Sequence, residues 1–453
     1  MSISAVFDAR FCQEKYPPPC VFVLFGATGN LAEKKIFPAL EALRKRRLFH
    51  PQSCIVAVSR RSISSRELAA KANISPELAA TLSTVKFDPE NDTSARILAD
   101  CLKKFDSSMG RIFYLAVPPS AFRNILLLSG RAKLFDEHGN FCNVVMEKPP
   151  GYTLEDVRNI YALLSCFLKK HQIYLIDHYL GKDEVQNILT LRFANRIFSG
   201  VWNCRNIESI TIAVNELNTV GTRAGYFDRA GIVRDMFQSH LLIMLGLCIM
   251  RRPAKFDAQH INSMLAGALK NISVRKVNFA GQYQGYLQTE QVSENSLTPT
   301  CADISFFNTS QRQKRSVFRL CAGKAMSSQR SFINVKFRSG VFPFSGRGMP
   351  SAIPGNEIEL ELKPFPGIKT VLCAKKNGPH LCFGTLMLSH TQKEHPATDG
   401  YQRLLIDCQN CDRTFFPDIS VFEETGRICD AAEELISSKG MAIYSPGTLE
   451  FST

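Results

Sequence analysis

The stretch V-F-V-L-F-G-A-T-G-N-L-A, residues 21–32, decides the fold of the N-terminal part of the chain. Its first half, Val21 to Phe25, is an uninterrupted apolar run, which is typical of a strand buried on both faces of a parallel sheet. A glycine turn follows at once, and then a helical pattern with apolar residues at Ile36, Leu40 and Leu43. The stretch therefore predicts a strand, a tight turn and a helix in direct succession.

The glycine turn has the features that a bound pyrophosphate requires. Gly26 permits the sharp turn, Gly29 lets backbone N–H groups approach phosphate oxygens, and Ala32 lets the helix pack close to the sheet. The spacing G-x-x-G-x-x-A is a weaker signal than G-x-G-x-x-G, but its position between a strand and a helix strengthens it. We therefore predict a dinucleotide held by Gly26, Ala27, Thr28, Gly29, Asn30 and Leu31.

A second apolar run, Cys54 to Val58, is followed by Ser59, Arg60 and Arg61. At the end of this strand, enzymes that use NAD carry an acidic residue for the ribose hydroxyl, whereas an arginine accommodates the 2′-phosphate of NADP. Two arginines without a carboxylate favour NADP, with Arg60 as the residue in contact. The alternative is that either arginine is an ordinary solvated surface residue.

Two further apolar runs, Ile112 to Val117 and Asn143 to Met146, alternate with helical segments. This alternation indicates a doubly wound α/β domain, in which ligands bind beyond the carboxyl ends of the strands. Tyr114 and Lys148 lie near such ends and are predicted to contact the cofactor. Lys148 could instead form a surface ion pair with its neighbour Glu147, which would add little stability.

The segment I-Y-L-I-D-H-Y-L-G-K, residues 173–182, begins like a strand and ends in several groups that ionise or form hydrogen bonds. An imidazole, a phenol and an ammonium group within five residues can present several donors to one anion, such as a phosphate monoester. A strand end with merely solvated polar groups is the alternative.

The rest of the chain alternates helix and strand patterns. Glu208 to Glu216 reads as a strand, residues 221–228 as a glycine-punctuated loop, and the run from Gly231 as an apolar helix. Asp235 and His240 would be separated by about 140° around an α-helix, since they are five residues apart. Strand patterns without intervening helices then predict a large antiparallel sheet, in the ranges 274–286, 316–321, 332–337, 357–362 and 368–374.

The composition bounds the functional classes. The 453 residues, 45% hydrophobic and 21% charged, suggest a globular protein of two domains, and no transmembrane helix is expected. The net charge of +14 is spread along the chain, so an anionic small molecule fits as well as a polynucleotide. Charged residues near the N-terminus and fifteen scattered cysteines, an odd number, favour reduced thiols in the cytoplasm. Cys408 and Cys411 form one C-x-x-C without partners for zinc, so no metal is predicted.

In this order, the segments resemble the glucose-6-phosphate dehydrogenase family over roughly residues 21–408. The most specific parts are D-H-Y-L-G-K at 177–182, V-Q-N-I-L-T-L-R-F-A-N-R-I-F at 185–198, G-Y-F-D-R-A-G-I-V-R-D-M-F-Q-S-H-L-L at 225–242 and G-K-A-M near Lys324. The resemblance implies a Rossmann-like NADP-binding domain, residues 1–176, and an α+β domain with a large antiparallel sheet, residues 177–453. It also implies a homodimer or homotetramer.

The implied reaction oxidises the anomeric carbon of glucose 6-phosphate to the lactone and passes a hydride to NADP, in the pentose phosphate pathway. The resemblance makes His240 the base and Asp177 its hydrogen-bonding partner. It assigns the phosphate to His178, Tyr179 and Lys182, the sugar to Glu216, Asp235 and Lys324, and a place between sugar and cofactor to Lys148. A histidine base with a carboxylate on its far nitrogen suits such a proton transfer chemically.

Several positions depart from the family pattern. Thr28 and Asn30 stand where Ser and Asp are usual, Pro150 follows E-K-P where Phe is usual, and Lys363 replaces Gln. Asn30 keeps a side chain able to form hydrogen bonds but has no negative charge. Pro150 is expected to reshape the loop around Lys148.

Two more departures concern anion binding. Gln329 takes the place of an arginine that meets the sugar phosphate in other members, and Arg330 follows it. Glu361 takes the place of an arginine that holds a second, structural NADP in some members. A carboxylate there would repel phosphate, so that second site is predicted to be absent.

Three other functions remain open from the sequence. The chain could oxidise a different sugar or sugar phosphate, because of Gln329 and Lys363. It could be a non-catalytic paralogue that only binds, although the acid, base and phosphate ligands of the two most specific segments are all present. A nucleic-acid binder would rest on net charge alone.

Overall fold

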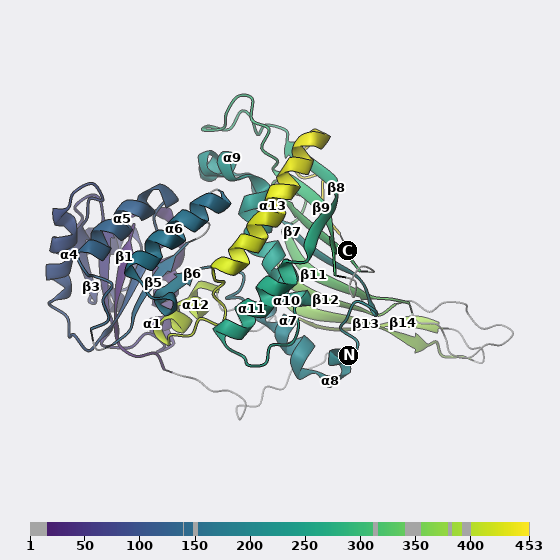
Figure 1. The fold of residues 1–453 in the computed structure, drawn as a ribbon, viewed down its shortest axis with the longest axis horizontal. Coiled ribbons are helices and arrows are strands. Elements are labelled where there is room, and N and C mark those ends of the chain that lie inside the picture. Colours follow the sequence, from purple (N-terminus) through teal and green to yellow (C-terminus); the bar gives the residue numbers. More distant parts are fainter. Residues whose placement is uncertain are drawn as a thin grey trace.

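A computed structural model describes residues 16–138, 140–147, 153–310, 316–339, 355–378, 383–391 and 400–452. The predicted site residue Lys148 and the unusual Pro150 lie outside the described residues. Within the described ranges the chain forms two sheets, each with helices packed against it (Figure 1).

Among the described residues, the N-terminal sheet has six parallel strands in the order β3-β2-β1-β4-β5-β6. The strands are β1 (Cys20–Phe25), β2 (Cys54–Ser59), β3 (Leu82–Lys86), β4 (Gly110–Leu115), β5 (Cys142–Met146) and β6 (Ile173–Leu175). Cys20, Phe22 and Leu24 face one hydrophobic cluster, and Val21, Val23 and Phe25 face another. The prediction of a strand buried on both faces is therefore confirmed, and the doubly wound order of the sheet confirms the Rossmann-like fold.

Helices connect and cover these strands. The glycine turn after β1 leads into the π-helical turn η2 (Ala32–Ile36) and then α1 (Phe37–Lys45). The remaining helical segments are α2 (Ser65–Lys71), α3 (Pro76–Ala79), α4 (Thr93–Leu102), α5 (Pro119–Arg131), α6 (Leu154–Phe167) and η3 (Lys170–Gln172).

The second sheet, as far as the structure describes it, has nine strands in the order β14-β13-β12-β11-β7-β10-β9-β8-β15. Their bounds are β7 (Ile207–Asn215), β8 (Ile272–Tyr283), β9 (Cys301–Asn308), β10 (Val317–Gly323), β11 (Arg330–Phe337), β12 (Glu357–Lys363), β13 (Gly367–Lys375), β14 (Phe383–Thr391) and β15 (Ala442–Tyr444). The pairs β7–β10 and β8–β15 are parallel and the other pairs are antiparallel. The predicted antiparallel sheet is thus confirmed in its main part, and two parallel pairings make it mixed.

Helices cover one face of this sheet, where α10, α11 and α13 lie together (Figure 1). The helical segments are α7 (Asp183–Ala194), α8 (Arg196–Ser199), η4 (Gly221–Arg223), α9 (Ala224–Ile232), η5 (Val233–Leu241), α10 (Leu242–Ile249), α11 (Ala258–Leu269), α12 (Gly400–Gln409) and α13 (Ile419–Lys439). The loop expected over residues 221–228 is wrong, because η4 and α9 occupy it. Phe227 and Ala230 are buried on α9, and this burial outweighs the turn tendency of the glycines.

The helical run Gly221–Ile249 is long and apolar enough to cross a membrane by length and composition alone. However, 89% of its apolar window is buried inside the molecule, as in the core helix of a globular protein. Gly231, with φ of 64°, also kinks the run near the end of α9, just before η5 begins. The run therefore packs as core helices against the second sheet.

Candidate active site

The glycine turn lies at the carboxyl end of β1, where the order of the parallel sheet reverses between β1 and β4. Gly26 has φ of 77°, and a Cβ there would lie 2.3 Å from the carbonyl oxygen of Ala116, so only glycine fits. The amides of Gly26 and Ala27 both donate to the Val58 carbonyl, at 2.9 and 3.1 Å. The amide of Gly29 donates to the Gly26 carbonyl at 2.9 Å.

These bonds shape the turn, so the segment that can meet a phosphate is 28–31. Thr28 and Leu31 are half-buried, and Asn30 is exposed. Arg60 follows β2, the neighbour of β1, and is exposed like Arg61. The predicted cofactor residues therefore lie along one edge of the sheet, as expected for adjacent parallel strands.

Tyr114, the other predicted cofactor residue within the described ranges, is fully buried in β4. Its hydroxyl donates to Glu147 Oε1 at 2.5 Å. Burial, with the Glu147 charge as the next cause, raises the pKa of the phenol well above its usual value, so it stays a donor. Tyr114 therefore supports the residue that precedes Lys148.

A carboxylate and a histidine form the centre of the sugar side. Asp177 follows β6 and is 0% exposed, and His240 lies at the end of η5 and is 4% exposed. His240 Nδ1 lies 2.7 Å from Asp177 Oδ1, which also accepts the backbone N–H of Tyr179 at 2.9 Å. An ionised carboxylate can only accept, so Nδ1 carries the proton and Nε2 is left as the basic nitrogen.

The segment 177–182 surrounds this pair with rings and a cation. The His240 ring lies 4.1 Å from the Tyr179 ring and 4.7 Å from the His178 ring, measured between centroids. Lys182 Nζ lies 3.8 Å from the centroid of the Tyr179 ring. The three predicted phosphate ligands are therefore brought together beside His240.

The helix that carries His240 is not an α-helix at this point. The segment η5, Val233–Leu241, is π-helical, so its hydrogen bonds join residues five positions apart. Asp235 and His240 consequently lie on consecutive turns of one face of the helix. The expected separation of 140° is wrong because it assumed 3.6 residues per turn.

Alternating charges continue from Asp235. Lys324 Nζ lies 3.2 Å from Asp235 Oδ2 and forms a short ion pair with Glu216. Burial alone would lower the pKa of Lys324, but Asp235 and Glu216 outweigh it and the net shift is upward. The ammonium group therefore stays charged although its side chain is only 9% exposed.

Gln329 lies at the edge of this cluster, where its side-chain oxygen accepts the backbone N–H of Leu217 at 3.3 Å. The following residue, Arg330, instead donates to Glu359 and Glu361 on β12, at 3.1 and 3.2 Å. Arg330 therefore does not stand in for the missing arginine. The carboxylate of Glu361 is held by this pairing, and the absence of a second NADP site stays a prediction.

Asp177, His178 and His240 each offer one ligand atom, and these atoms lie within 4.8 Å of one another, so they could also chelate a metal ion. The hydrogen bond between Asp177 Oδ1 and His240 Nδ1 is the interaction that joins two of these residues in the structure. That no metal is needed stays a prediction.

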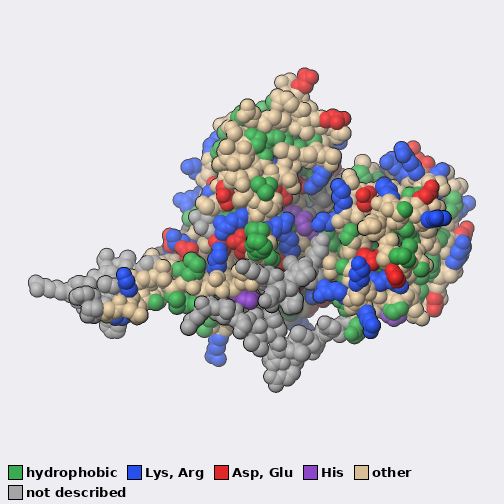
Figure 2. All heavy atoms as spheres, turned by 180° about the vertical axis from the view of Figure 1, so that it is seen from behind, with side chains coloured by type: hydrophobic (Ala, Val, Ile, Leu, Met, Phe, Trp, Pro, Cys, Tyr) green, Lys and Arg blue, Asp and Glu red, His purple; other side chains and the backbone are tan. Residues whose placement is uncertain are grey.

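Figure 2 shows His, Lys and Arg side chains gathered where the two parts of the molecule meet.

Two family models together match most of the chain. The family model of the glucose-6-phosphate dehydrogenase NAD binding domain matches residues 23–187, and that of the C-terminal domain matches residues 189–452. This chain belongs to the glucose-6-phosphate dehydrogenase family. The match reaches 44 residues beyond the end expected at residue 408, and this additional stretch contains α13 and β15.

Individual relatives of the glucose-6-phosphate dehydrogenase family cover most of the chain. A glucose-6-phosphate 1-dehydrogenase of Treponema pallidum is 31% identical over 91% of this chain and 88% of its own. The cytoplasmic enzyme 5 of Arabidopsis thaliana is 32% identical over 87% of this chain and 81% of its own. A solved glucose-6-phosphate dehydrogenase in complex with glucose 6-phosphate superposes with a TM-score of 0.87, at 28% identity and with 96% of each chain covered.

Two residues near this glucose-6-phosphate dehydrogenase site were not predicted from the sequence. Arg223 donates to Asp235 Oδ1 at 3.2 Å, and it was placed in a loop because glycines surround it. Tyr401, at the start of α12, stacks on His178 with centroids 5.9 Å apart and an interplanar angle of 4°. No local pattern marks Tyr401, because more than two hundred residues separate it from its partner.

Proposed function

We propose that the chain is an NADP-dependent glucose-6-phosphate 1-dehydrogenase, which catalyses the first oxidative step of the pentose phosphate pathway. Family membership gives the class of reaction. The observation that carries the proposal is the buried pair of Asp177 and His240, 2.7 Å apart, beside a group of cations. A base, its orienting carboxylate and an anion-binding group are the parts that oxidation of a phosphorylated sugar requires.

His240 is the proposed base of the reaction. Its Nε2 takes the proton of the anomeric hydroxyl as the C1–H bond breaks, and the electron pair left on oxygen completes the lactone carbonyl. Asp177 fixes the tautomer through Nδ1 and stabilises the imidazolium that forms. Bound NADP supplies the hydride acceptor at its nicotinamide ring. Burial of both side chains keeps water from weakening this interaction.

The cations of the site are assigned to the substrate. His178, Tyr179 and Lys182 are proposed to bind the phosphate, with Lys148 between sugar and cofactor. Burial raises the pKa of the Tyr179 phenol, and the charge of Glu216 adds to that shift, so the hydroxyl donates. Glu216, Asp235, Lys324 and Gln329 are proposed to hold the sugar, since carboxylates accept from hydroxyls and the others donate.

The cofactor is assigned to the edge of the parallel sheet. The pyrophosphate is assigned to the turn 26–31, in which Gly26 and Ala27 shape the backbone and Thr28, Gly29, Asn30 and Leu31 face the phosphates. Arg60 is assigned to the 2′-phosphate of NADP. Tyr114 acts through Glu147, because its hydroxyl bonds that carboxylate. We place the NADP-binding domain at residues 1–176 and the substrate domain at 177–453, supported by the end of β6 at Leu175.

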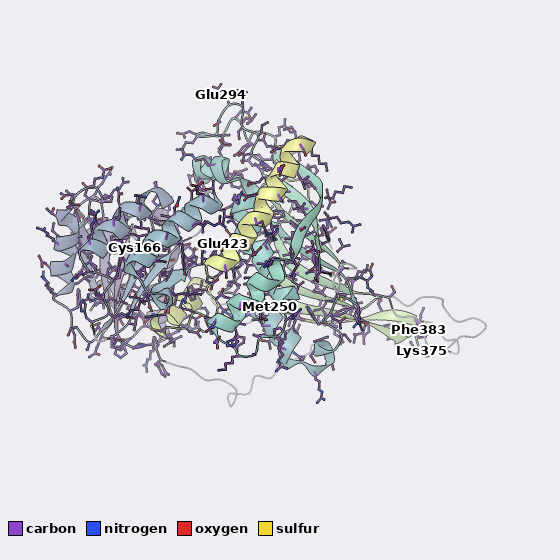
Figure 3. All side chains as sticks on the ribbon, viewed as in Figure 1. Cys166, Met250, Glu294, Lys375, Phe383 and Glu423 are labelled. Carbon is purple, nitrogen blue, oxygen red and sulfur yellow. The ribbon has the colours of Figure 1, made fainter. Side chains whose placement is uncertain are left out.

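We further propose a homodimer or homotetramer in which a second copy covers the ribbon of β13 and β14. This ribbon extends from the body of the molecule, and Lys375 and Phe383 pair at its outer end (Figure 3). Met387 is 65% exposed, and β14 carries no Lys, Arg, Asp or Glu over its nine residues. A long edge strand without such charges associates readily with another chain. Light scattering of the purified protein tests this; a monomer would contradict it.

We propose a cytoplasmic location, supported by two Arabidopsis relatives that are named cytoplasmic. The thirteen cysteines in the described part of the chain are all free, which suits a reducing compartment. Fractionation of cells that express the full chain tests the location.

The deciding experiment follows NADPH formation by the purified chain with glucose 6-phosphate, beside NAD and beside unphosphorylated glucose. We expect turnover with the phosphorylated sugar and NADP. Turnover only with another sugar would indicate a related dehydrogenase. No turnover, with thermal stabilisation by the sugar phosphate, would indicate a protein that only binds.

A further inference from the structure

Arg223 lies at the end of η4 and faces the charged cluster of the sugar side. Its Nη2 donates to Asp235 Oδ1 at 3.2 Å, while Lys324 Nζ lies 3.2 Å from Asp235 Oδ2. Each oxygen of one carboxylate is therefore held by a different cation. The side chain of Asp235 is 10% exposed and that of Arg223 is 64% exposed, so the carboxylate is enclosed and the guanidinium reaches solvent.

The charges of this cluster balance. Arg223 and Lys324 contribute two positive charges, and Asp235 and Glu216 contribute two negative charges. Burial alone would raise the pKa of the Asp235 carboxyl. Lys324, Arg223 and His240, in that order, outweigh burial and hold this pKa below its usual value. Removing Arg223 would leave one surplus negative charge in a site that must accept a dianion.

We propose that Arg223 is a positioning residue for substrate binding, which fixes the orientation of the Asp235 carboxylate. This inference rests on the proposed function, in which Asp235 holds the sugar. The ring of Tyr226 lies 5.2 Å from the guanidinium carbon and limits how far Arg223 can swing. With both oxygens fixed, the carboxylate meets a sugar hydroxyl without first having to reorient.

A purely structural ion pair is the competing interpretation. Because the Arg223 side chain is 64% exposed, water screens the pair and its contribution to stability is small. The two interpretations therefore differ in what the residue affects. A positioning residue changes the KM for the sugar phosphate and the pH profile, whereas a structural pair changes only the melting temperature.

The sign of the pH effect follows from the groups around Asp235. These are Lys324 after β10, Arg223 from η4, His240 from the same helix, and the Tyr179 phenol from the segment after β6. Without Arg223 the pKa of Asp235 rises, so the carboxylate is protonated at a higher pH than in the wild type. On acidification, the Kd of glucose 6-phosphate should therefore begin to rise at a higher pH in Arg223→Ala than in the wild type.

The experiment compares Arg223→Ala, Arg223→Lys and the control Arg229→Ala, an exposed arginine on α9. We expect Arg223→Ala to raise the KM for glucose 6-phosphate about two- to tenfold, because the partly screened contact acts on the sugar only through Asp235. The KM of Arg223→Ala for NADP should change less than about twofold, and its melting temperature by no more than a few degrees. Arg229→Ala should stay within the same limits for both KM values and for the melting temperature. Arg223→Lys, which keeps the charge but not the planar fork, should be intermediate.

A double variant and a binding measurement separate this inference from the proposed function. Arg223→Ala combined with Asp235→Asn should be no worse than Asp235→Asn alone, because the effect passes through Asp235. The Kd of glucose 6-phosphate, measured by calorimetry, does not need turnover. If an inactive wild type binds the sugar phosphate and Arg223→Ala weakens that binding, the inference holds and the proposed function fails. Equal Kd values for the two proteins, or no binding by the wild type, would overturn the inference.

Discussion

On the cofactor edge, Asn30 and Arg60 are exposed and the amides of Gly26, Ala27 and Gly29 are used inside the turn. On the sugar side, by contrast, Asp177, His240 and Lys324 are 0%, 4% and 7% exposed and bond to one another or to near neighbours. The cofactor, which must enter and leave, therefore meets a backbone turn and the exposed side chain of Arg60. The reacting sugar meets the buried side chains of Asp177, His240 and Lys324, which are already held in place by their neighbours.

This difference assigns different kinetic roles to the two sides. Charge that develops at the anomeric oxygen is stabilised best by groups that need not move during the reaction. Exposed contacts add binding energy in the ground state and the transition state alike, and so mainly change KM. Substitutions on the sugar side should therefore lower kcat or weaken sugar binding, and those on the cofactor edge should raise the KM for the cofactor.

The largest effect is expected for His240→Asn. The amide can occupy the buried space and donate to Asp177, but it cannot take a proton, so kcat should fall about 10²- to 10⁴-fold. The Kd of glucose 6-phosphate should change little, since His240 is not assigned to the phosphate. Stopped-flow NADPH formation and calorimetry measure the two quantities. A near-normal kcat would remove His240 as the base.

Arg60→Ala tests the cofactor edge. Loss of a charge-assisted hydrogen bond to the 2′-phosphate should raise the KM for NADP about 10- to 100-fold, while the KM for NAD changes little. The matched control is Arg61→Ala, since Arg61 is equally exposed and adjacent. Equal effects of Arg60→Ala on both cofactors would refute its assignment, and a larger effect of Arg61→Ala would transfer the role to that residue.

Most strands of the first sheet were predictable because they contain an apolar run bounded by turn residues, whereas β3, L-S-T-V-K with two half-buried polar residues, was not predicted. Strand β1 shows why such a run is reliable: both of its faces are buried, so apolar side chains are required at every position. The glycine turn followed from the same local logic. The pairing of Asp177 with His240 did not, because 63 residues separate them, and it came from the resemblance.

Two features of the site depended on tertiary packing and escaped the local patterns. The relation of Asp235 to His240 depends on π-helical hydrogen bonds, which periodicity analysis does not include. Arg223 was read as part of a loop because Gly221 and Gly225 flank it, but burial of Phe227 fixes the segment as a helix. Propensity is overruled where a helix face is packed against the core.

Gly181→Ala tests how far the rigidity of the sugar side depends on α12. A Cβ at Gly181 would lie 2.2 Å from the carbonyl oxygen of Gly400, so the start of α12 must shift and with it Tyr401, which stacks on His178. We expect a loss of about 1–3 kcal/mol in the free energy of unfolding, as in other overpacked sites. The KM for glucose 6-phosphate should also rise several-fold, and the KM for NADP should not.

Gly200→Ala is the matched control, because a Cβ there meets nothing within 4 Å and its φ of −83° suits any residue. Urea unfolding and steady-state kinetics of both variants provide the comparison. If Gly181→Ala keeps wild-type stability and KM, α12 does not hold the phosphate segment in place.

Gln329→Arg should change the KM for glucose 6-phosphate least. It tests a half-buried position at the edge of the buried charged cluster of Glu216, Asp235 and Lys324. The side-chain oxygen of Gln329 accepts from the Leu217 amide, next to Glu216. The family resemblance implies that an arginine at this position meets the sugar phosphate, so a guanidinium should add a contact there. The gain is limited because a half-exposed cation is screened and its long side chain must be ordered, so the KM for glucose 6-phosphate should fall only about two- to fivefold. Gln329→Ala, which loses the bond to Leu217 without adding charge, separates the two contributions. A rise in KM for Gln329→Arg equal to that for Gln329→Ala would show that the amide bond, and not the missing cation, matters at this position.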